Sequence, residues 1–240
     1  MSQKVDPVTF EVLRNLFEYS CARMTKVLQR SSFSPILADM LDFSNAIFDA
    51  DLKLLSQDAN CPVHLAAMKF SAEAIAEKYP ISSMKEGDVY INNDPYKGGT
   101  HINDMTFVLP IFHNSALLGF AVSRGHWMDL GGGAAGGQSF GTHIAAEGLR
   151  LPPLKVYENY KVNQDIQEII LNNTRTPHFV KGDLQAHFGC LRAAESELHR
   201  AAERYGIDTM QAAMKELQEY TERIIRRSIE TIPDGEYEAT

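Results

Sequence analysis

The feature that most constrains the fold is a pair of apolar runs in the middle of the chain. Residues 105–112 and 116–123 are rich in apolar and aromatic side chains, and His113-Asn114-Ser115 separates them. Two such runs joined by a short polar turn indicate a β-hairpin. The hairpin would bring the segments on its two outer flanks, residues 92–104 and 124–129, to the same end.

These two flanking segments carry the polar groups that favour catalysis. His101 and Asp104 lie three residues apart, and His126 follows after the hairpin. Two imidazoles and a carboxylate suit zinc, manganese or iron(II), and three protein ligands with an open position are typical of a catalytic metal site. Asp42 and Asp129 are candidates for further ligands or supporting partners. The alternative is that these side chains only satisfy the hydrogen bonds of their own loops.

A glycine-rich loop at residues 131–141 follows the second segment. Six of its eleven residues are glycine, so its backbone N–H groups can approach a ligand or a developing oxyanion closely. It lacks the lysine of a P-loop and the strand-to-helix setting of a dinucleotide fingerprint. Candidates for a neighbouring substrate pocket are Asp94, Asp129, His143 and Glu147. Turn formation, capping or packing is the alternative role for Asp94, His143 and Glu147.

Helical periodicity dominates both ends of the chain. Asp6-Pro7 is typical of a helix start, and apolar residues recur at helical spacing as far as about residue 30. A second hairpin is predicted around Ala50-Asp51 and a short strand at 88–92. Further helices are predicted at 62–79, 164–173, 182–206 and 208–230. The pattern predicts an α+β fold in which antiparallel hairpins and a sheet pack with long amphipathic helices, ending in a helical segment.

We divide the sequence into three regions. Residues 1–160 form an α+β region with the metal site, and residues 161–232 form a helical region. Residues 233–240 resemble the start of a strand that has no room to pair. A strand edge of this kind needs cover from another chain. We therefore expect a chain that is truncated or split.

Composition excludes several classes of function. The net charge is −8, and the basic residues are scattered, which argues against nucleic-acid binding. No apolar run reaches the ~18–20 residues of a membrane span, and the first residues lack a secretory signal pattern. We therefore expect a cytoplasmic protein without membrane contact. Cys21, Cys61 and Cys190 are too few and too dispersed for a disulfide framework, and we interpret them as small buried side chains.

Several motifs in sequence order resemble the hydantoinase B/oxoprolinase family. They are Asp-Phe-Ser with Ile-Phe-Asp-Ala-Asp (42–51), Pro-Val-His-Leu (62–65), Asn-Asp-Pro-Tyr with Gly-Gly-Thr-His (93–101) and Asp104, Arg-Gly-His-Trp-Met-Asp-Leu-Gly-Gly (124–132), Glu-Gly-Leu-Arg-Leu-Pro-Pro (147–153), Asn-Thr-Arg-Thr-Pro (173–177) and Gly-Asp-Leu (182–184). The family includes the hydantoinase B component of N-methylhydantoinase, 5-oxoprolinase and the metal subunit of acetone carboxylase. The chain resembles the N-terminal portion of such proteins.

The resemblance implies a divalent metal, zinc, manganese or iron, held by Asp42, His101, Asp104 and His126, with the last three in catalytic roles. It also implies that ATP binds only to a partner, a hydantoinase A-type subunit, in a hetero-oligomer. The expected function is the metal-dependent part of an ATP-dependent cyclic amide hydrolase, active only within the complex. The alternative is the metal subunit of an acetone or aryl ketone carboxylase. A third interpretation is a structural remnant without activity.

Two positions depart from the family pattern. Family members commonly have His-His where His126-Trp127 stands and Ala-Gln where Ala186-His187 stands. Both departures affect the expected shape of the pocket, so the resemblance does not define the identity of the substrate.

Overall fold

A seven-stranded antiparallel sheet forms the centre of the computed structural model, which describes residues 5–137 and 142–238. The strand order is β2-β1-β5-β4-β3-β6-β7. The longest strands, β4 (Asp104–His113) and β5 (Ala116–His126), pair in the middle. The turn residues Asn114 and Ser115 have φ of 49° and 66°, the left-handed conformation that matches strand twist in tight hairpins. The predicted central hairpin is confirmed.

The other strands extend this sheet on both sides. β1 (Phe43–Asp49) and β2 (Leu54–Ala59) form the second predicted hairpin, and β3 (Val89–Asn92) is the predicted short strand. β6 (Leu154–Glu158) and β7 (Lys161–Val162) were not predicted. They are short, and only the pairing of β6 with β3 and β7 defines them. The α+β fold class is confirmed.

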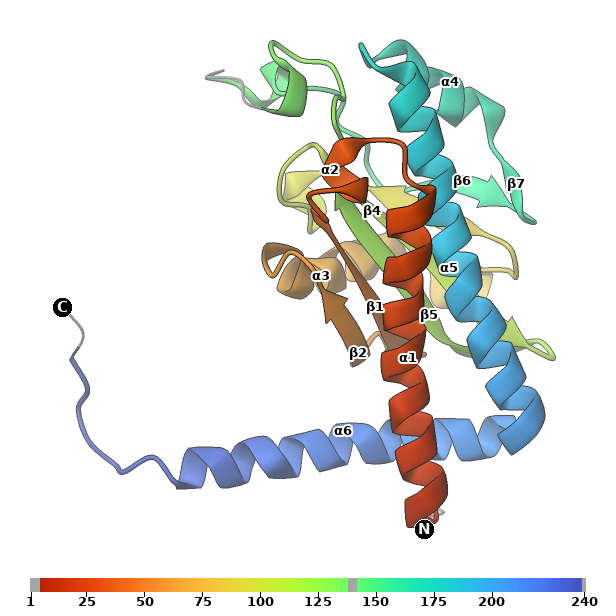
Figure 1. Ribbon diagram of the computed structural model, residues 1–240, viewed down its shortest axis with the longest axis vertical. Helices are drawn as coiled ribbons and strands as arrows, with labels where there is room; N and C mark the ends of the chain where they lie inside the picture. The colour runs from red at the N-terminus through yellow and green to blue at the C-terminus, as the bar shows by residue number, and fades with distance from the viewer. Residues whose placement is uncertain (1–4, 138–141, 239–240) are drawn as a thin grey trace.

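Helices cover both faces of the sheet (Figure 1). α1 (Pro7–Ser31) and α5 (Pro177–Tyr205) lie side by side on one face, and α3 (Val63–Lys78) lies on the other. Strand side chains alternate accordingly: Phe107 packs in the core beneath α1 and α5, whereas Val108 packs in the core beneath α3. The sheet is therefore buried on both faces.

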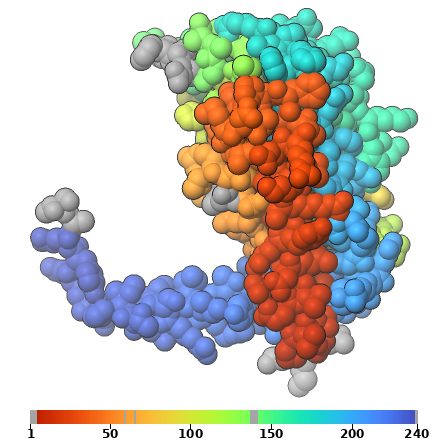
Figure 2. Space-filling view, in the orientation of Figure 1, coloured from red at the N-terminus to blue at the C-terminus, as the bar shows by residue number. Residues whose placement is uncertain are grey.

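Shorter elements complete the chain. α2 (Pro35–Ala38) was not predicted, whereas α4 (Gln164–Asn172) and α6 (Ile207–Glu230) agree with the sequence. Figures 1 and 2 show that α6 crosses the foot of α1 and continues away from the body. Among the described residues, none of the helices has the length and apolar character that crossing a membrane requires.

The end of the chain differs from the expected strand. Residues 233–238 contain no strand, and the remaining residues of the predicted strand, 239–240, lie outside the described residues. The division at residue 160 stays a prediction. One continuous apolar core includes residues of α1 and of α5, which come from the two predicted regions.

The start of α5 corrects the sequence interpretation. The helix begins at Pro177, not at residue 182, because proline suits the first helical position. Gly182 lies inside the helix, where a Cβ would be 2.2 Å from Cγ of Phe33. The Asp183 carboxylate accepts the N–H groups of Phe33 and Ser34 at 2.8 and 3.1 Å. The glycine therefore permits close packing of the α1–α2 connection rather than a helix end.

His187 of α5 is fully buried against the central hairpin. Its ring stacks on Phe107 with a centroid distance of 4.5 Å, and its Nδ1 lies 2.9 Å from the Ser123 hydroxyl. Burial lowers its pKa to about 3. The imidazole is therefore neutral in the folded protein at neutral pH. His187, which stands where the resemblance leads us to expect glutamine, thus lies in the core.

We predict opposite stability effects for two glycines of α5. Gly182→Ala should lower the free energy of unfolding by about 1–2 kcal/mol, because the new methyl group collides with Phe33. Gly189→Ala is the matched control. A Cβ there meets only Val27 at 3.9 Å, so the better helix former should raise stability by about 0.5–1 kcal/mol. Urea unfolding measures both, and equal effects of the same sign would contradict the packing role of Gly182.

The buried imidazole predicts an acid-labile core. Because the pKa of His187 is depressed in the folded state, its contribution is complete above pH ~6.5 and is lost as pH falls from there towards about 3. His187→Gln should flatten this part of the stability profile by up to about 1.4 kcal/mol per pH unit. Urea unfolding at a series of pH values measures the slope. An unchanged slope would show that other groups cause the loss.

Candidate metal centre

The central hairpin brings Asp104 and His126 together. They are the first residue of β4 and the last of β5, and the strand register makes them direct partners. Side chains of directly opposed residues lie close enough to interact, and His126 Nδ1 lies 2.8 Å from Asp104 Oδ1. The predicted meeting of these two groups is confirmed.

The loop before β4 folds around the same carboxylate. The Thr100 hydroxyl and the His101 N–H, at 3.3 Å, both donate to Asp104 Oδ2. Burial alone raises the pKa of Asp104, but hydrogen bonds from His126 and Thr100 outweigh it and hold that pKa well below its usual range. Burial lowers the pKa of His126, but the Asp104 carboxylate outweighs this and raises it. The pair therefore favours an ionised Asp104 carboxylate and a protonated His126 ring.

His101 lies beside this pair, although the ligand atoms of His101, Asp104 and His126 do not form a group within 4.8 Å of one another among the described residues. Its ring stands edge-on to that of His126, with a centroid distance of 6.0 Å and an angle of 77°. The His101 residue is exposed, whereas Asp104 is buried. The two imidazoles thus approach one another at the end of the hairpin.

Asp42 arrives from the residues immediately before β1. The His126 N–H donates to the Asp42 carbonyl oxygen at 2.9 Å, which ties the two segments together through the backbone. The Asp42 carboxylate pairs with His64 Nε2 at 3.1 Å. Its contact in this structure is thus with a histidine that was not predicted as a site residue.

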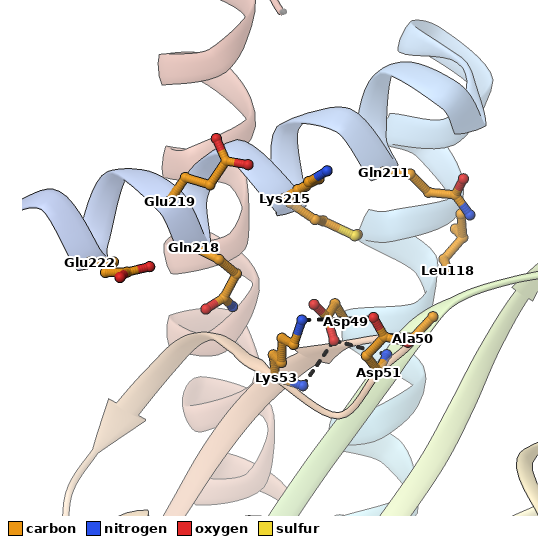
Figure 3. Close-up of a pocket in the computed structure, with 11 residues that line it drawn as sticks. Asp49, Ala50, Asp51, Lys53, Leu118, Gln211, Lys215, Gln218, Glu219 and Glu222 are labelled. Carbon is orange, nitrogen blue, oxygen red and sulfur yellow. Dashed lines mark hydrogen bonds and ion pairs between the residues drawn. The ribbon is translucent and has the colours of Figure 1, made fainter. Parts of the chain in front are cut away.

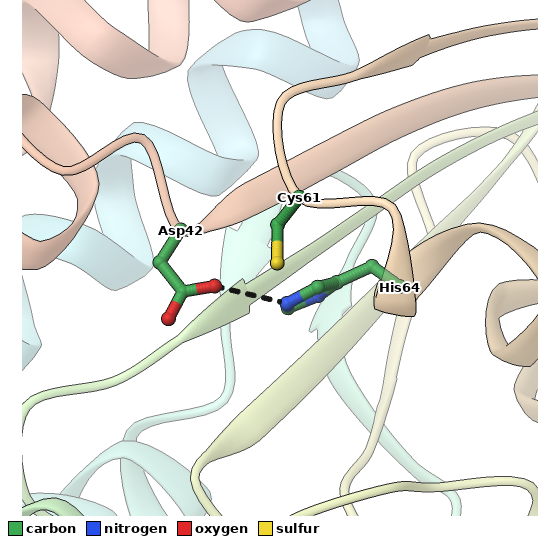
Figure 4. A group of neighbouring side chains, drawn as sticks. All are labelled: Asp42, Cys61 and His64. Atoms are coloured by element: carbon green, nitrogen blue, oxygen red, sulfur yellow. Dashed lines mark hydrogen bonds and ion pairs between the residues drawn. The ribbon is translucent and has the colours of Figure 1, made fainter.

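His64 and Cys61 are the site residues that the sequence interpretation missed. One ligand atom from each, together with a carboxylate oxygen of Asp42, lies within 4.8 Å of the other two (Figure 4). Burial lowers the pKa of His64, while burial and the adjacent Asp42 raise that of Cys61. Within the residues that the structure describes, this is the one group of three ligand residues at that spacing. The three-residue spacing of Cys61 and His64 was the available signal.

All these residues border one cavity of about 440 Å³. The lining is Ile36, Met40, Asp42, Cys61, Val63, His64, His101, Asp104, His126 and Gly136. Imidazole and carboxylate donors around an open space fit a divalent transition metal. The contact of Asp104 with His126 Nδ1 also matches the way a carboxylate fixes the tautomer of a ligating histidine, leaving the other ring nitrogen to bind. The assignment of individual ligands stays a prediction.

Trp127 lies in the core rather than in this cavity. It is buried and packs near Phe107, with a ring-centroid distance of 5.8 Å. The tryptophan that replaces the family's second histidine therefore contributes to the core beside the site.

Contacts with neighbouring segments occupy several N–H groups of the glycine-rich loop. Asp129 accepts the N–H of Gly131, the Ala146 carbonyl accepts that of Gly133, and the Met128 carbonyl accepts that of Gly136. These three N–H groups are therefore engaged by the chain, and an oxyanion role for the loop stays a prediction. Residues 138–141 of the predicted loop lie outside the described residues.

The predicted substrate-pocket residues lie apart from the cavity lining. Asp94 accepts the Tyr96 N–H at the start of a short 3-10 helix, and His143 accepts the Ala145 N–H in the same manner. Glu147 ends the helical turn that His143 begins. His143 also borders a separate cavity of about 440 Å³ beside the glycine-rich loop. Capping is therefore the role that the contacts of Asp94 and His143 support, and a substrate role stays a prediction.

Asp129 is buried and is fully engaged by the chain. Its carboxylate accepts the Arg175 guanidinium at 2.7 Å, the Arg175 backbone N–H, and the hydroxyl of Thr174 at 3.2 Å. Arg175 also donates to the Gly132 carbonyl. This ion pair fastens the glycine-rich loop to the segment before α5.

A further cavity lies elsewhere. It measures about 520 Å³ between the β1–β2 turn and α6 (Figure 3). Its lining includes Asp49, Asp51 and Lys53 from the turn and Glu219 and Glu222 from the helix. Hydrogen bonds from the backbone N–H groups of Asp51 and Lys53 to the Asp49 carboxylate shape the turn itself. None of the predicted site residues is in the described lining of this cavity.

The sequence profile of the hydantoinase B/oxoprolinase family matches residues 6–240. The chain belongs to this family. It is 33% identical over 237 residues to the beta subunit of the caprolactamase of Pseudomonas jessenii, covering 98% of this chain and 41% of that one. The chain thus spans less than half the length of this relative.

Two solved structures resemble the fold. The crystal structure of the ATP-dependent caprolactamase from Pseudomonas jessenii matches with a TM-score of 0.91 and 32% identity over 97% of this chain and 40% of that one. A nucleotide-free acetone carboxylase matches with a TM-score of 0.78 and 18% identity over 87% of this chain and 28% of that one. At this lower identity, the second match shows the shared fold alone.

We predict that Arg175 controls the order of the glycine-rich loop. Arg175→Gln leaves the buried Asp129 carboxylate without its cation, so residues 131–137 should become more accessible to hydrogen exchange and proteases, with a stability loss of about 1–3 kcal/mol. Arg226→Gln is the control, since Arg226 forms an exposed pair on α6 with Glu222 and should change stability by less than ~1 kcal/mol. Equal protection of the loop in both variants would contradict the role.

Proposed function

We propose that the chain is the metal-bearing part of an ATP-dependent hydrolase that opens cyclic amides. The observation that supports this most directly is the cavity bordered by Asp42, His101, Asp104 and His126 in a chain of the hydantoinase B/oxoprolinase family. The similar chain from Pseudomonas jessenii carries the name of an enzyme for a lactam. We therefore assign the substrate to the lactam class, with hydantoin and 5-oxoproline as further members.

In this proposal His101, Asp104, His126 and Asp42 hold a divalent ion of zinc, manganese or iron. Such an ion supplies a Lewis acid and makes water available as a nucleophile at neutral pH. Residues of the chain prepare the site. The low pKa of Asp104 keeps this carboxyl group ionised, and the contact of Asp104 with His126 Nδ1 orients the His126 ring. Asp42 is held against His126 through the backbone. These contacts support the assignment of Asp42, Asp104 and His126 to one site.

Activation by ATP belongs to a second polypeptide in this proposal. The sequence lacks a P-loop lysine in its glycine-rich loop, and the similar caprolactamase chain is named as one subunit of its enzyme. Phosphorylation of an amide oxygen by an A-type ATP-binding partner would make the ring carbon open to attack by water. The working unit is then a hetero-oligomer, and the chain alone hydrolyses nothing.

Metal content tests the site. The purified full chain should bind a divalent transition metal, and His101→Ala and His126→Ala should each lower the bound amount at least about 10-fold, since each removes one ligand of a small set. His113→Ala is the control, because His113 lies at the opposite end of the hairpin. Inductively coupled plasma mass spectrometry measures the content. Full metal content in both ligand variants would sink the assignment.

Product analysis tests the reaction. The chain and its A-type partner should open caprolactam, hydantoin or 5-oxoproline with consumption of ATP, and His126→Ala should abolish ring opening while the partner still binds. Bicarbonate-dependent formation of a carbon–carbon bond would instead identify the metal subunit of a ketone carboxylase, the alternative that the sequence analysis left open. Turnover of neither substrate class, together with an absence of bound metal, would leave a structural role.

A further inference from the structure

Cys61 and His64 belong to the cavity but not to the metal site proposed above. Cys61 stands in the turn between β2 and α3, and His64 stands in the first turn of α3; both border the same cavity as Asp42. The Cys61 N–H donates to the Phe43 carbonyl at 3.2 Å, and the His64 N–H donates to the Cys61 carbonyl at 3.2 Å. The turn is therefore fastened to the first residue of β1, directly after Asp42. Backbone contacts thus hold the three residues as a unit.

Their side chains converge on one point. In Figure 4 the Cys61 thiol is directed into the space between the Asp42 carboxylate and the His64 ring. The three ligand atoms lie within 4.8 Å of one another, and the carboxylate and the ring nitrogen are already 3.1 Å apart. Ligand atoms around a tetrahedral zinc ion lie ~3.3–3.8 Å apart. Small side-chain rotations are sufficient to reach that spacing.

The chemistry of the three ligands selects a class of ion. A thiolate, an imidazole and a carboxylate are the ligand types that zinc combines, and the soft sulfur disfavours magnesium, calcium and manganese. His64 is almost fully buried, whereas Asp42 and Cys61 are only partly buried. The partly open side leaves a fourth position for water. The set therefore suits a thiophilic divalent ion.

The His64 ring directs Nε2 at the Asp42 carboxylate, at 3.1 Å. Its other nitrogen, Nδ1, is buried and has no hydrogen-bond partner among the described residues. The contact with Asp42 is therefore the polar role that the structure gives this ring, and Nε2 is the nitrogen placed to bind an ion.

We propose that Asp42, Cys61 and His64 bind a zinc-class cation at a second metal subsite of this cavity, beside His101, Asp104 and His126. Asp42 is the residue common to the two subsites. One of its oxygens faces His64, and the other points away from that ring in Figure 4. A carboxylate whose two oxygens face different directions is suited to join two ions, as in two-metal hydrolytic sites. The proposal depends on Cys61, which the proposed hydrolase site does not use.

Cobalt(II) substitution tests the second subsite. A thiolate bound to cobalt produces a charge-transfer band in the near ultraviolet, which imidazole and carboxylate ligands do not. The chain of 240 residues titrated with cobalt(II) should develop this band and bind a second equivalent. Cys61→Ser should lose the band and one equivalent, and His64→Gln should weaken both. His101→Ala should keep the band, and Cys190→Ala is the control for the loss of a thiol.

A chemical measurement on the unaltered chain complements these variants. Zinc should protect Cys61 against alkylation by iodoacetamide at least 10-fold, with the labelled position read by peptide mass spectrometry. Binding of cobalt without a thiolate band, or unprotected Cys61 at saturating zinc, would overturn the proposal. A single equivalent that depends on both Cys61 and His101 would overturn the second subsite. The two sites can fail separately. If His101→Ala loses one equivalent of metal and keeps the thiolate band, the two subsites are distinct; if His101→Ala keeps all its metal, only the hydrolase site is contradicted.

Discussion

The direct pairing of Asp104 with His126 across the central hairpin is the interaction on which the site depends. The register of β4 and β5 fixes it, and the resulting 2.8 Å contact fixes one nitrogen of the imidazole. Because strand side chains alternate between faces, a slip of one residue would send one partner to the opposite face. The apolar cores beneath α1 and α5 and beneath α3 lock that register. Core packing thus determines the chemistry at the end of the strands.

A buried cation connects this hairpin to the loop that carries His101. Arg124 of β5 is fully buried and donates to the Thr106 hydroxyl at 2.7 Å and to the Gly98 carbonyl at 2.9 Å. Burial lowers its pKa to about 10, so it remains charged at neutral pH. A buried charge requires such hydrogen bonds. The hydrogen bond from Arg124 to the Gly98 carbonyl therefore helps to hold the loop that leads to His101.

Sequence patterns predicted the parts of this structure that are local. The apolar runs and the polar turn define β4 and β5, and the hairpin alone brings His126 to Asp104. The start of α5 escaped prediction because Gly182 resembles a helix boundary, whereas its missing side chain makes room for Phe33, about 150 residues earlier in the chain. Cys61 escaped for the same reason: only the packing of the β2–α3 turn against β1 brings it to Asp42.

The hydrogen bond from the His126 N–H to the Asp42 carbonyl has a kinetic consequence. It makes Asp42, Asp104 and His126 part of the sheet, so these three separate only when the strands themselves open. His101 stands outside the strands and is exposed, so its side chain can move while the sheet stays closed. In the proposed site, the motion of the His101 side chain then governs how fast an ion enters or leaves, while Asp42, Asp104 and His126 stay in place.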